Sequence, residues 1–197
     1  AQVLADELSA RGVKAVASDS ISESSSAVVF LGGLRAVADA DAAIATPREA
    51  YAVARTIAPN FTKNGGLFVT VQDTGGAFGT TAHAPERAWL GGLPALVKTA
   101  SQEWPTASLK AIDLQRGERD DLSLAQALAD ELLLGGGELE VGLSSQGERV
   151  SPRSVACDVQ RGEATLSKDD VVVVSGGARG VTASCIIRWA AECHGRF

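Results

Sequence analysis

The chain has 197 residues, with 45% hydrophobic content, 21 glycines and a formal net charge of −6 at pH 7. This length allows one large domain, or one domain and a piece of another. Because no cluster of lysine or arginine could neutralise phosphates, we expect no nucleic acid among its partners. No stretch approaches the roughly 20 apolar residues that cross a bilayer, so we expect no membrane partner and a cytoplasmic location.

The cysteines and histidines do not form a metal-binding motif. Cys157, Cys185 and Cys193 are an odd number and lack Cys-x-x-Cys spacing, so we expect reduced thiols. His83 and His194 are far apart in the sequence, so we expect no metal site. The chain contains no methionine, which indicates a piece of a longer polypeptide.

Helical and strand patterns alternate from residue 2 to residue 143. Amphipathic spacing and helix-ending residues predict helices over residues 2–10, 47–57, 93–103 and 122–134. In the second of these, Pro47 suits the first turn of a helix. Apolar, β-branched runs predict strands over residues 13–17, 27–31, 67–71, 109–114 and 139–143. Strands separated by helices imply a doubly wound α/β fold, in which helices cover both faces of a parallel sheet.

The loops between these elements carry weaker signals. The alanine-rich run 36–45 predicts a solvated loop or a short helix. Residues 32–33 and 73–76 contain glycine directly after strands, and we expect turns there in preference to ligand contacts. Residues 118–121 carry three acidic side chains, which place negative charge at the positive end of the next helix.

The most informative segment, residues 169–183, has the sequence DDVVVVSGGARGVTA. Its four consecutive valines predict a strand buried on both faces of a parallel sheet. The glycines that follow allow a tight turn, in which backbone amides approach a pyrophosphate at the start of a helix over residues 181–193. We therefore assign cofactor binding to Ser175, Gly176, Gly177, Ala178, Arg179, Gly180 and Val181. A plain glycine-rich turn with a solvated arginine remains the alternative.

This loop resembles a known family. Residues 175–182, SGGARGVT, resemble the T-G-x-x-x-G-x-G loop of the short-chain dehydrogenase/reductases, and most closely the ketoreductase domains of polyketide and polyunsaturated fatty acid synthases. Thr182 stands where the family has its third glycine. In that family an arginine between the glycines often meets the 2′-phosphate of NADP. The resemblance therefore implies NADPH as the cofactor, with Arg179 on its 2′-phosphate, which suits a planar guanidinium.

A second segment, residues 91–113, is similar to the long helix and next strand that follow the catalytic tyrosine in these reductases. By that resemblance the Tyr-x-x-x-Lys pair would fall near Glu86 and Leu90. Neither side chain can act as the proton donor or as the charge that tunes it. The only tyrosine, Tyr51, is followed by Arg55 in an earlier helix, and we interpret it as a packing residue. We therefore predict no catalytic residues in this chain.

The resemblance implies a division into three parts. Residues 1–141 are a structural pseudo-ketoreductase with a truncated Rossmann-like sheet, and residues 142–168 are a linker. Residues 169–197 are the first strand, loop and helix of a second Rossmann fold, the catalytic NADP-binding subdomain. The parent would reduce β-ketoacyl groups on acyl carrier protein with NADPH, and its partners would be the remainder of the ketoreductase domain, other synthase domains and that carrier. The alternatives are a non-catalytic scaffold that positions neighbouring domains or the carrier protein, and a minimal nucleotide-binding enzyme.

Overall fold

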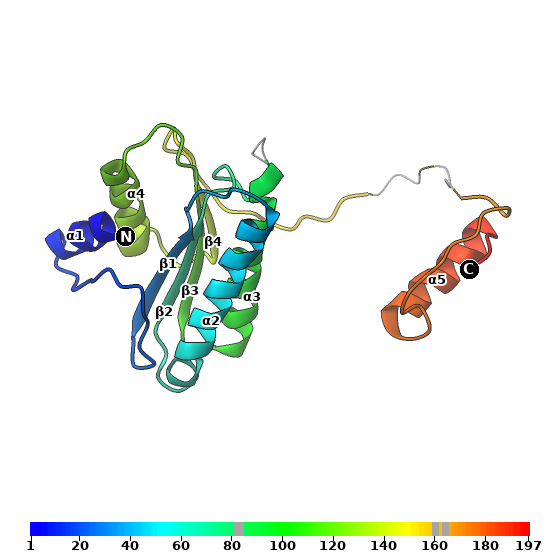
Figure 1. The fold of residues 1–197 in the computed structure, drawn as a ribbon, viewed down its shortest axis with the longest axis horizontal. Helices are drawn as coiled ribbons and strands as arrows, with labels where there is room; N and C mark the ends of the chain where they lie inside the picture. Colours follow the sequence, from blue (N-terminus) through cyan, green and yellow to red (C-terminus); the bar gives the residue numbers. More distant parts are fainter. Residues whose placement is uncertain (81–84, 159–161, 163–165) are drawn as a thin grey trace. The chain divides into compact units, whose positions relative to one another are not determined.

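The computed structural model describes residues 1–80, 85–158, 162 and 166–197. The chain divides into two compact units, Ala1–Arg153 and Ser154–Phe197 (Figure 1). The division lies inside the segment predicted as a linker, residues 142–168.

Six helical segments and five strands form the described chain. The helices are α1 (Gln2–Ala10), α2 (Ala40–Asn64), the 3-10 helix η1 (Pro85–Gly91), α3 (Gly92–Glu103), α4 (Asp121–Leu134) and α5 (Gly180–Cys193). The strands are β1 (Ala27–Gly33), β2 (Leu67–Gln72), β3 (Ser108–Leu114), β4 (Glu140–Leu143) and β5 (Arg149–Val150). Within the described ranges, no helix is both long enough and apolar enough to cross a membrane.

The first unit contains a five-stranded sheet in the order β1-β2-β3-β4-β5. Strands β1 to β4 run parallel, and β5 is an antiparallel strand at the edge next to β4. The register places Val69 of β2 between Val29 of β1 and Lys110 of β3. The carboxyl ends of four parallel strands therefore lie along one edge of the sheet.

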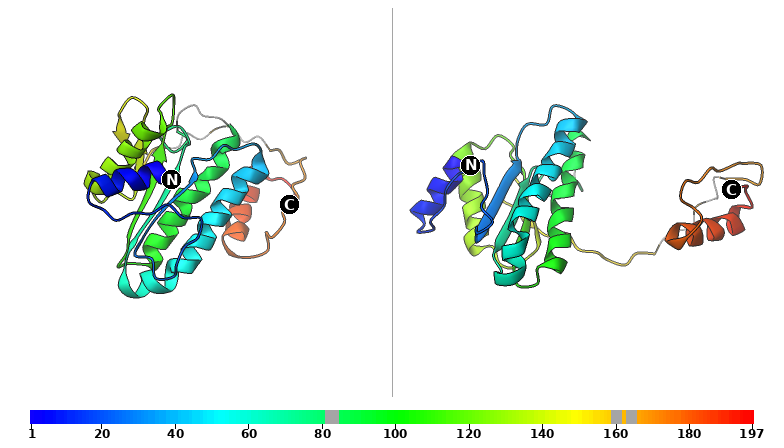
Figure 2. Two further views of the ribbon diagram at one scale, coloured as in Figure 1. Left: turned by 60° about the vertical axis from the view of Figure 1, so that its left-hand side comes forward. Right: turned by 60° about the horizontal axis from the view of Figure 1, so that its bottom comes forward.

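Helices cover both faces of this sheet (Figure 1, Figure 2). Because side chains alternate along a strand, Val69 and Ile112 pack with α1 and α4, whereas Phe68 and Ala111 pack with α2 and α3. On the α2/α3 face, Trp104 is buried and lies edge-on to the ring of Phe68, with centroids 6.1 Å apart. The predicted α/β fold class is confirmed.

Two local predictions in this unit are wrong. Residues 13–17 do not form a strand, and Val16 is 80% exposed. A β-branched run gains a strand conformation only with a partner, and in the described structure β1 pairs with β2 alone. Helix α2 begins at Ala40, seven residues before Pro47. Asp39 caps it by accepting a hydrogen bond from the Ala42 amide at 2.8 Å, so the proline lies inside the helix and not in its first turn.

Candidate functional site

In the second unit, helix α5 lies in the chain between two segments that a single parallel bridge joins. The Val172 amide donates to the Arg196 carbonyl at 2.8 Å, and the Arg196 amide donates to the Asp170 carbonyl at 3.1 Å. These bonds make a parallel bridge between Val171 and Arg196, with α5 between them in the chain. A parallel return across a helix is the βαβ arrangement on which dinucleotide-binding loops are built.

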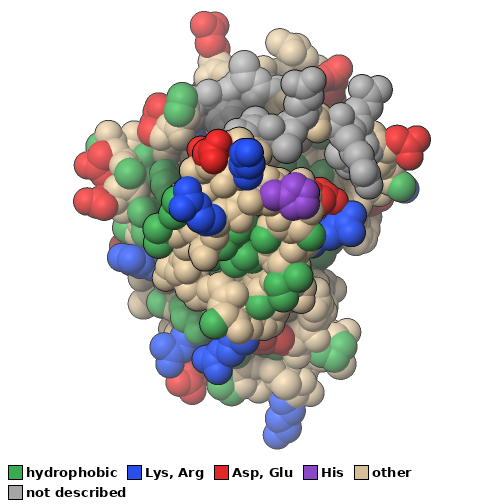
Figure 3. Space-filling view, turned by 90° about the vertical axis from the view of Figure 1, so that its right-hand side faces the viewer, with side chains coloured by type: hydrophobic (Ala, Val, Ile, Leu, Met, Phe, Trp, Pro, Cys, Tyr) green, Lys and Arg blue, Asp and Glu red, His purple; other side chains and the backbone are tan. Residues whose placement is uncertain are grey.

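The strand itself differs from the prediction of a fully buried one. Residues 171–174 form only this single bridge, and Val173 is 94% exposed. The physical reason is that a valine run is buried only when sheet neighbours and covering helices are present, and in the described part of this unit only Arg196 pairs with it. The unit also exposes Val181, Ile187 and other large apolar side chains. Hydrophobic side chains are visible on the face drawn in Figure 3.

Each glycine of the predicted loop has a separate physical role. Gly176 and Gly180 have φ of +73° and +66°, a region that side chains with a Cβ rarely adopt. A Cβ at Gly177 would lie 2.7 Å from Cδ1 of Ile186 on α5 and 3.0 Å from Cγ1 of Val174, so the end of the Ile186 side chain would have to shift. The turn thus depends on glycine at positions 176 and 180, and glycine at position 177 leaves room for Ile186.

The predicted site residues lie together between the strand and α5. Ser175, Gly176, Ala178, Arg179, Gly180 and Val181 are exposed, and Gly177 is half-buried. Helix α5 begins at Gly180, one residue earlier than predicted, and Arg179 precedes it in an extended conformation. The first turn of α5 contains no acidic residue, and no side chain of the described residues caps it. Its amides are therefore free to meet an anion, and the positive end of the helix favours one.

The carboxyl edge of the first unit's sheet is organised around Asp113, at the end of β3. Its carboxylate accepts hydrogen bonds from the Thr74 amide at 2.6 Å, the Thr74 hydroxyl at 2.9 Å and the Phe78 amide at 2.6 Å. Burial raises the pKa of the Asp113 carboxyl, against the lowering effect of these hydrogen bonds, and the nearby charge of Asp73 raises it further. The loop after β2 is thereby held over the end of β3.

Arg87 of η1 closes the same edge over β1 and β2. Its guanidinium donates to three backbone carbonyls, those of Asp73 at 2.5 Å, Arg35 at 3.1 Å and Gly33 at 2.7 Å. At Gly33 a Cβ would lie 2.5 Å from the Val71 carbonyl oxygen, so this glycine serves close strand packing. The loops that an open sheet uses for a ligand are here bonded to each other.

Glu86 and Leu90, the positions expected for the Tyr-x-x-x-Lys pair, also lie in η1. Leu90 is buried, and Glu86 is exposed. Tyr51 is 56% exposed on α2, with the guanidinium carbon of Arg55 6.0 Å from its ring centroid. Among the described residues, no group of three histidine, cysteine, aspartate or glutamate side chains could hold a metal ion. His83 lies outside the described residues.

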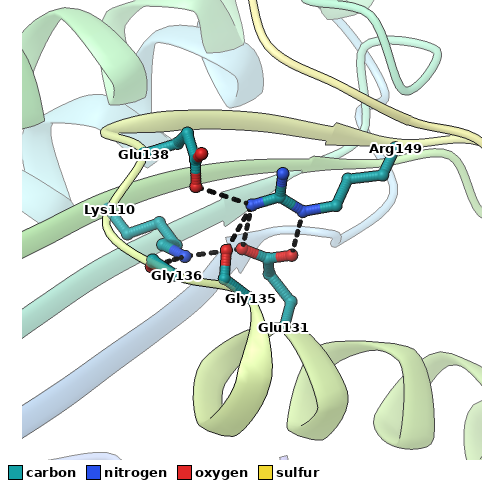
Figure 4. Close-up of polar contacts among 6 residues, drawn as sticks. All are labelled: Lys110, Glu131, Gly135, Gly136, Glu138 and Arg149. Atoms are coloured by element: carbon teal, nitrogen blue, oxygen red, sulfur yellow. Dashed lines mark hydrogen bonds and ion pairs between the residues drawn. The ribbon is translucent and has the colours of Figure 1, made fainter.

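The opposite end of the sheet carries an ion-pair cluster around the buried Glu131 that sequence reasoning missed (Figure 4). Glu131 of α4 accepts from Lys110 Nζ at 2.5 Å and from Arg149 Nε at 2.7 Å. Lys110 also donates to the Gly136 carbonyl at 2.8 Å, and Arg149 pairs with Glu138 at 3.0 Å. The cluster joins β3, the end of α4 and β5, so it fixes the hairpin after β4.

These structural side chains share a signal that was available in the sequence. Lys110 and Asp113 stand in the apolar strand SLKAIDL, and Glu131 stands in the apolar helix DLSLAQALADELLL. A charged side chain inside an apolar run requires a partner when it is buried. The sequence does not say which partner, because the hydrogen bonds to Asp113 come from residues 35 to 39 positions away.

Comparisons with known proteins agree with a synthase origin. No family model matches the chain. It is 32% identical over 126 residues, which is 60% of this chain, to one of the polypeptides of a polyunsaturated fatty acid synthase from Thraustochytrium sp.. It is 37% identical to the PKS-NRPS hybrid synthetase acdB of Aspergillus candidus over 103 residues, which is 51% of this chain. The chain covers 4% of the length of each relative, so the similarity concerns a short segment of two multidomain synthases.

Proposed function

We propose that the chain is the structural half of a ketoreductase domain in a multidomain fatty acid or polyketide synthase, followed by the NADPH-binding loop of the catalytic half. The parent protein, in the cytoplasm, would use NADPH to reduce the β-keto group of an acyl chain carried by acyl carrier protein. Similarity to segments of two multidomain synthases supports this setting. The remaining ketoreductase residues and other synthase domains would be its partners.

The observation that carries the proposal is the difference between the two units at their strand ends. In the first unit, Asp113 and Arg87 occupy the carboxyl edge and bond its loops together. A doubly wound sheet binds its ligand at that edge, so a closed edge supports a structural role. In the second unit, the loop around Gly177 is exposed and lies before a helix start without a capping side chain.

The loop residues fit the cofactor that the resemblance implies. Backbone amides at the start of α5 would meet the pyrophosphate, and Gly176 and Gly180 have the conformations that let the backbone turn around it. Arg179 would meet the 2′-phosphate, which distinguishes NADPH from NADH. NADPH supplies the hydride, and the proton donor would come from other residues of the parent, since Glu86 and Leu90 provide no suitable acid.

Arg179→Ala in the parent protein tests this assignment. Loss of a charge-assisted contact should weaken NADPH binding by about 1.5–3 kcal/mol, while NADH binding changes little. Arg188→Ala is the matched control, because Arg188 lies on the same helix in an exposed pair with Glu192. Equal losses for NADPH and NADH would show that Arg179 does not contact the 2′-phosphate.

A scaffold that only positions neighbouring domains or the carrier protein is the second candidate. The apolar side chains exposed by the second unit favour it, because such surfaces often mark protein contacts. The proposed structural role predicts that deleting residues 1–141 from the parent yields an insoluble or unfolded catalytic half. A folded and fully active reductase without these residues would instead favour the scaffold.

A further inference from the structure

The loop from Asp73 to Thr80 wraps around a single carboxylate. Thr74 contributes its amide and hydroxyl, and Phe78 contributes its amide, so three donors lie 2.6–2.9 Å from the oxygens of Asp113. Both oxygens accept, since the Thr74 amide bonds Oδ1 and the other two donors bond Oδ2. The donors come from the loop, whereas the acceptor comes from β3.

An unusual backbone conformation produces this convergence. Four of the loop residues have positive φ: Gly75 at 97°, Gly76 at 75°, Phe78 at 53° and Gly79 at 73°. Left-handed residues in a turn direct neighbouring amides to one side and form a concave anion site. Phe78 is not a glycine and so adopts this conformation at a cost. The hydrogen bond from the Phe78 amide to Asp113 offsets that cost, together with the partial packing of the Phe78 ring on the α2/α3 face.

The carboxylate inside this loop is fully buried. Asp113 is 0% exposed, and it forms no ion pair within the described residues. Its charged neighbour, Asp73, is itself held by the amides of Gly75 at 3.1 Å and Arg116 at 3.1 Å. Among the described residues, the neutral donors of the loop therefore hold the carboxylate of Asp113.

We propose that the loop formed by residues 73–80 is a binding site for a small carboxylate anion, and that Asp113 fills it from within the same chain. The loop amides and the Thr74 hydroxyl would accept a free carboxylate in place of the side chain. An internal anion thus closes the edge of the sheet that a ligand would otherwise enter. This inference does not depend on the proposed reductase setting.

Chemical rescue tests the proposal. Asp113→Ala keeps Cβ and removes the carboxylate group. Formate has the same carboxylate group and is small enough to take its place. The full-length chain carrying this substitution should be destabilised in sodium chloride and restabilised by sodium formate at equal ionic strength. The thermal midpoint should rise with the logarithm of the formate concentration once this exceeds the dissociation constant, and by roughly 3–5 °C at ten times that constant. Amide exchange at Thr74 and Phe78 should slow in parallel.

Asp120→Ala is the matched control. The Asp120 carboxylate also accepts a hydrogen bond from a backbone amide, that of Ser123 at 2.8 Å. It caps an exposed helix end, however, and does not lie inside a loop. Formate should not restabilise this variant. If Asp113→Ala folds only in formate, the proposal is supported. If formate and chloride act alike on it, whether the variant is folded or unfolded in both, the proposal is wrong.

Thr74→Val combined with Asp113→Ala measures one donor of the site. Removing the hydroxyl should raise the formate dissociation constant about fivefold to tenfold, the equivalent of one hydrogen bond. An unchanged dissociation constant would place the bound formate elsewhere and would overturn the assignment to this loop.

Discussion

Glu131→Leu should destabilise the first unit more than any substitution in an exposed ion pair. Glu131 is 3% exposed and lies between Lys110, whose side chain is 9% exposed, and Arg149. Without Glu131, Lys110 would keep only the Gly136 carbonyl and would remain a buried, unpaired ammonium. Removing one partner of a buried pair typically costs about 3–5 kcal/mol.

Most of this cost should come from Lys110 and little from Arg149. The hydrogen bonds that Arg149 donates to Glu131, and then to Glu138, raise the pKa of its guanidinium. Its side chain is nevertheless 37% exposed, and it keeps the pair with Glu138. Water can therefore replace part of what Arg149 loses, and its share should be under about 1 kcal/mol. The expected total for Glu131→Leu is about 3–5 kcal/mol.

Urea unfolding followed by tryptophan fluorescence provides the assay, because Trp104 is buried in the first unit. Adding Lys110→Met should recover most of the loss, to within about 1 kcal/mol of the wild type, since an apolar pair leaves no buried charge. Lys98→Met is the control, because Lys98 is 51% exposed in its pair with Glu140 and should cost less than about 1 kcal/mol. The reasoning is refuted if the double variant is as unstable as Glu131→Leu alone.

Two further predictions concern a helix cap and a loop. Hydrogen bonds from the Ser123 side chain and amide lower the pKa of Asp120, so its stabilising effect should be present above the ordinary aspartate pKa of about 3.9 and be lost as pH falls below it. Urea midpoints of the wild type and Asp120→Asn should therefore converge on acidification; a constant difference between them would exclude this contribution. Gly176→Ala should destabilise the second unit by about 1 kcal/mol because φ is +73° there, as measured by amide exchange in α5. Gly162→Ala is the control, because Gly162 has no positive φ and no described atom within 4 Å of an added Cβ. This substitution should leave the stability of the second unit unchanged.

The sequence predicts most of this fold because the core follows local patterns. Strands β1 to β4 lie where apolar, β-branched runs stand, and α3 ends at Glu103, just before Trp104-Pro105. The errors arise where tertiary contacts override local preference. Residues 13–17 have strand composition but no partner, and α2 continues through Pro47 because Asp39 caps it and a long apolar face is buried.

The candidate sites were only partly predictable. The glycine loop at residues 175–180 has a local motif, and the structure adds that Ile186 lies close to Gly177. The contacts of Asp113, Arg87 and Glu131 join residues far apart in the sequence, and no short motif encodes them. A sequence shows that a buried charge needs a partner, whereas only the fold identifies that partner.

Amide exchange of the parent protein with and without NADPH distinguishes a cofactor site in the second unit from one in the first. We expect slower exchange at residues 175–183, where the loop and the start of α5 would meet the pyrophosphate. We expect no change at residues 73–80, where Asp113 already occupies the loop. Slower exchange at residues 73–80, with none at residues 175–183, would place the cofactor in the first unit and contradict the proposed function.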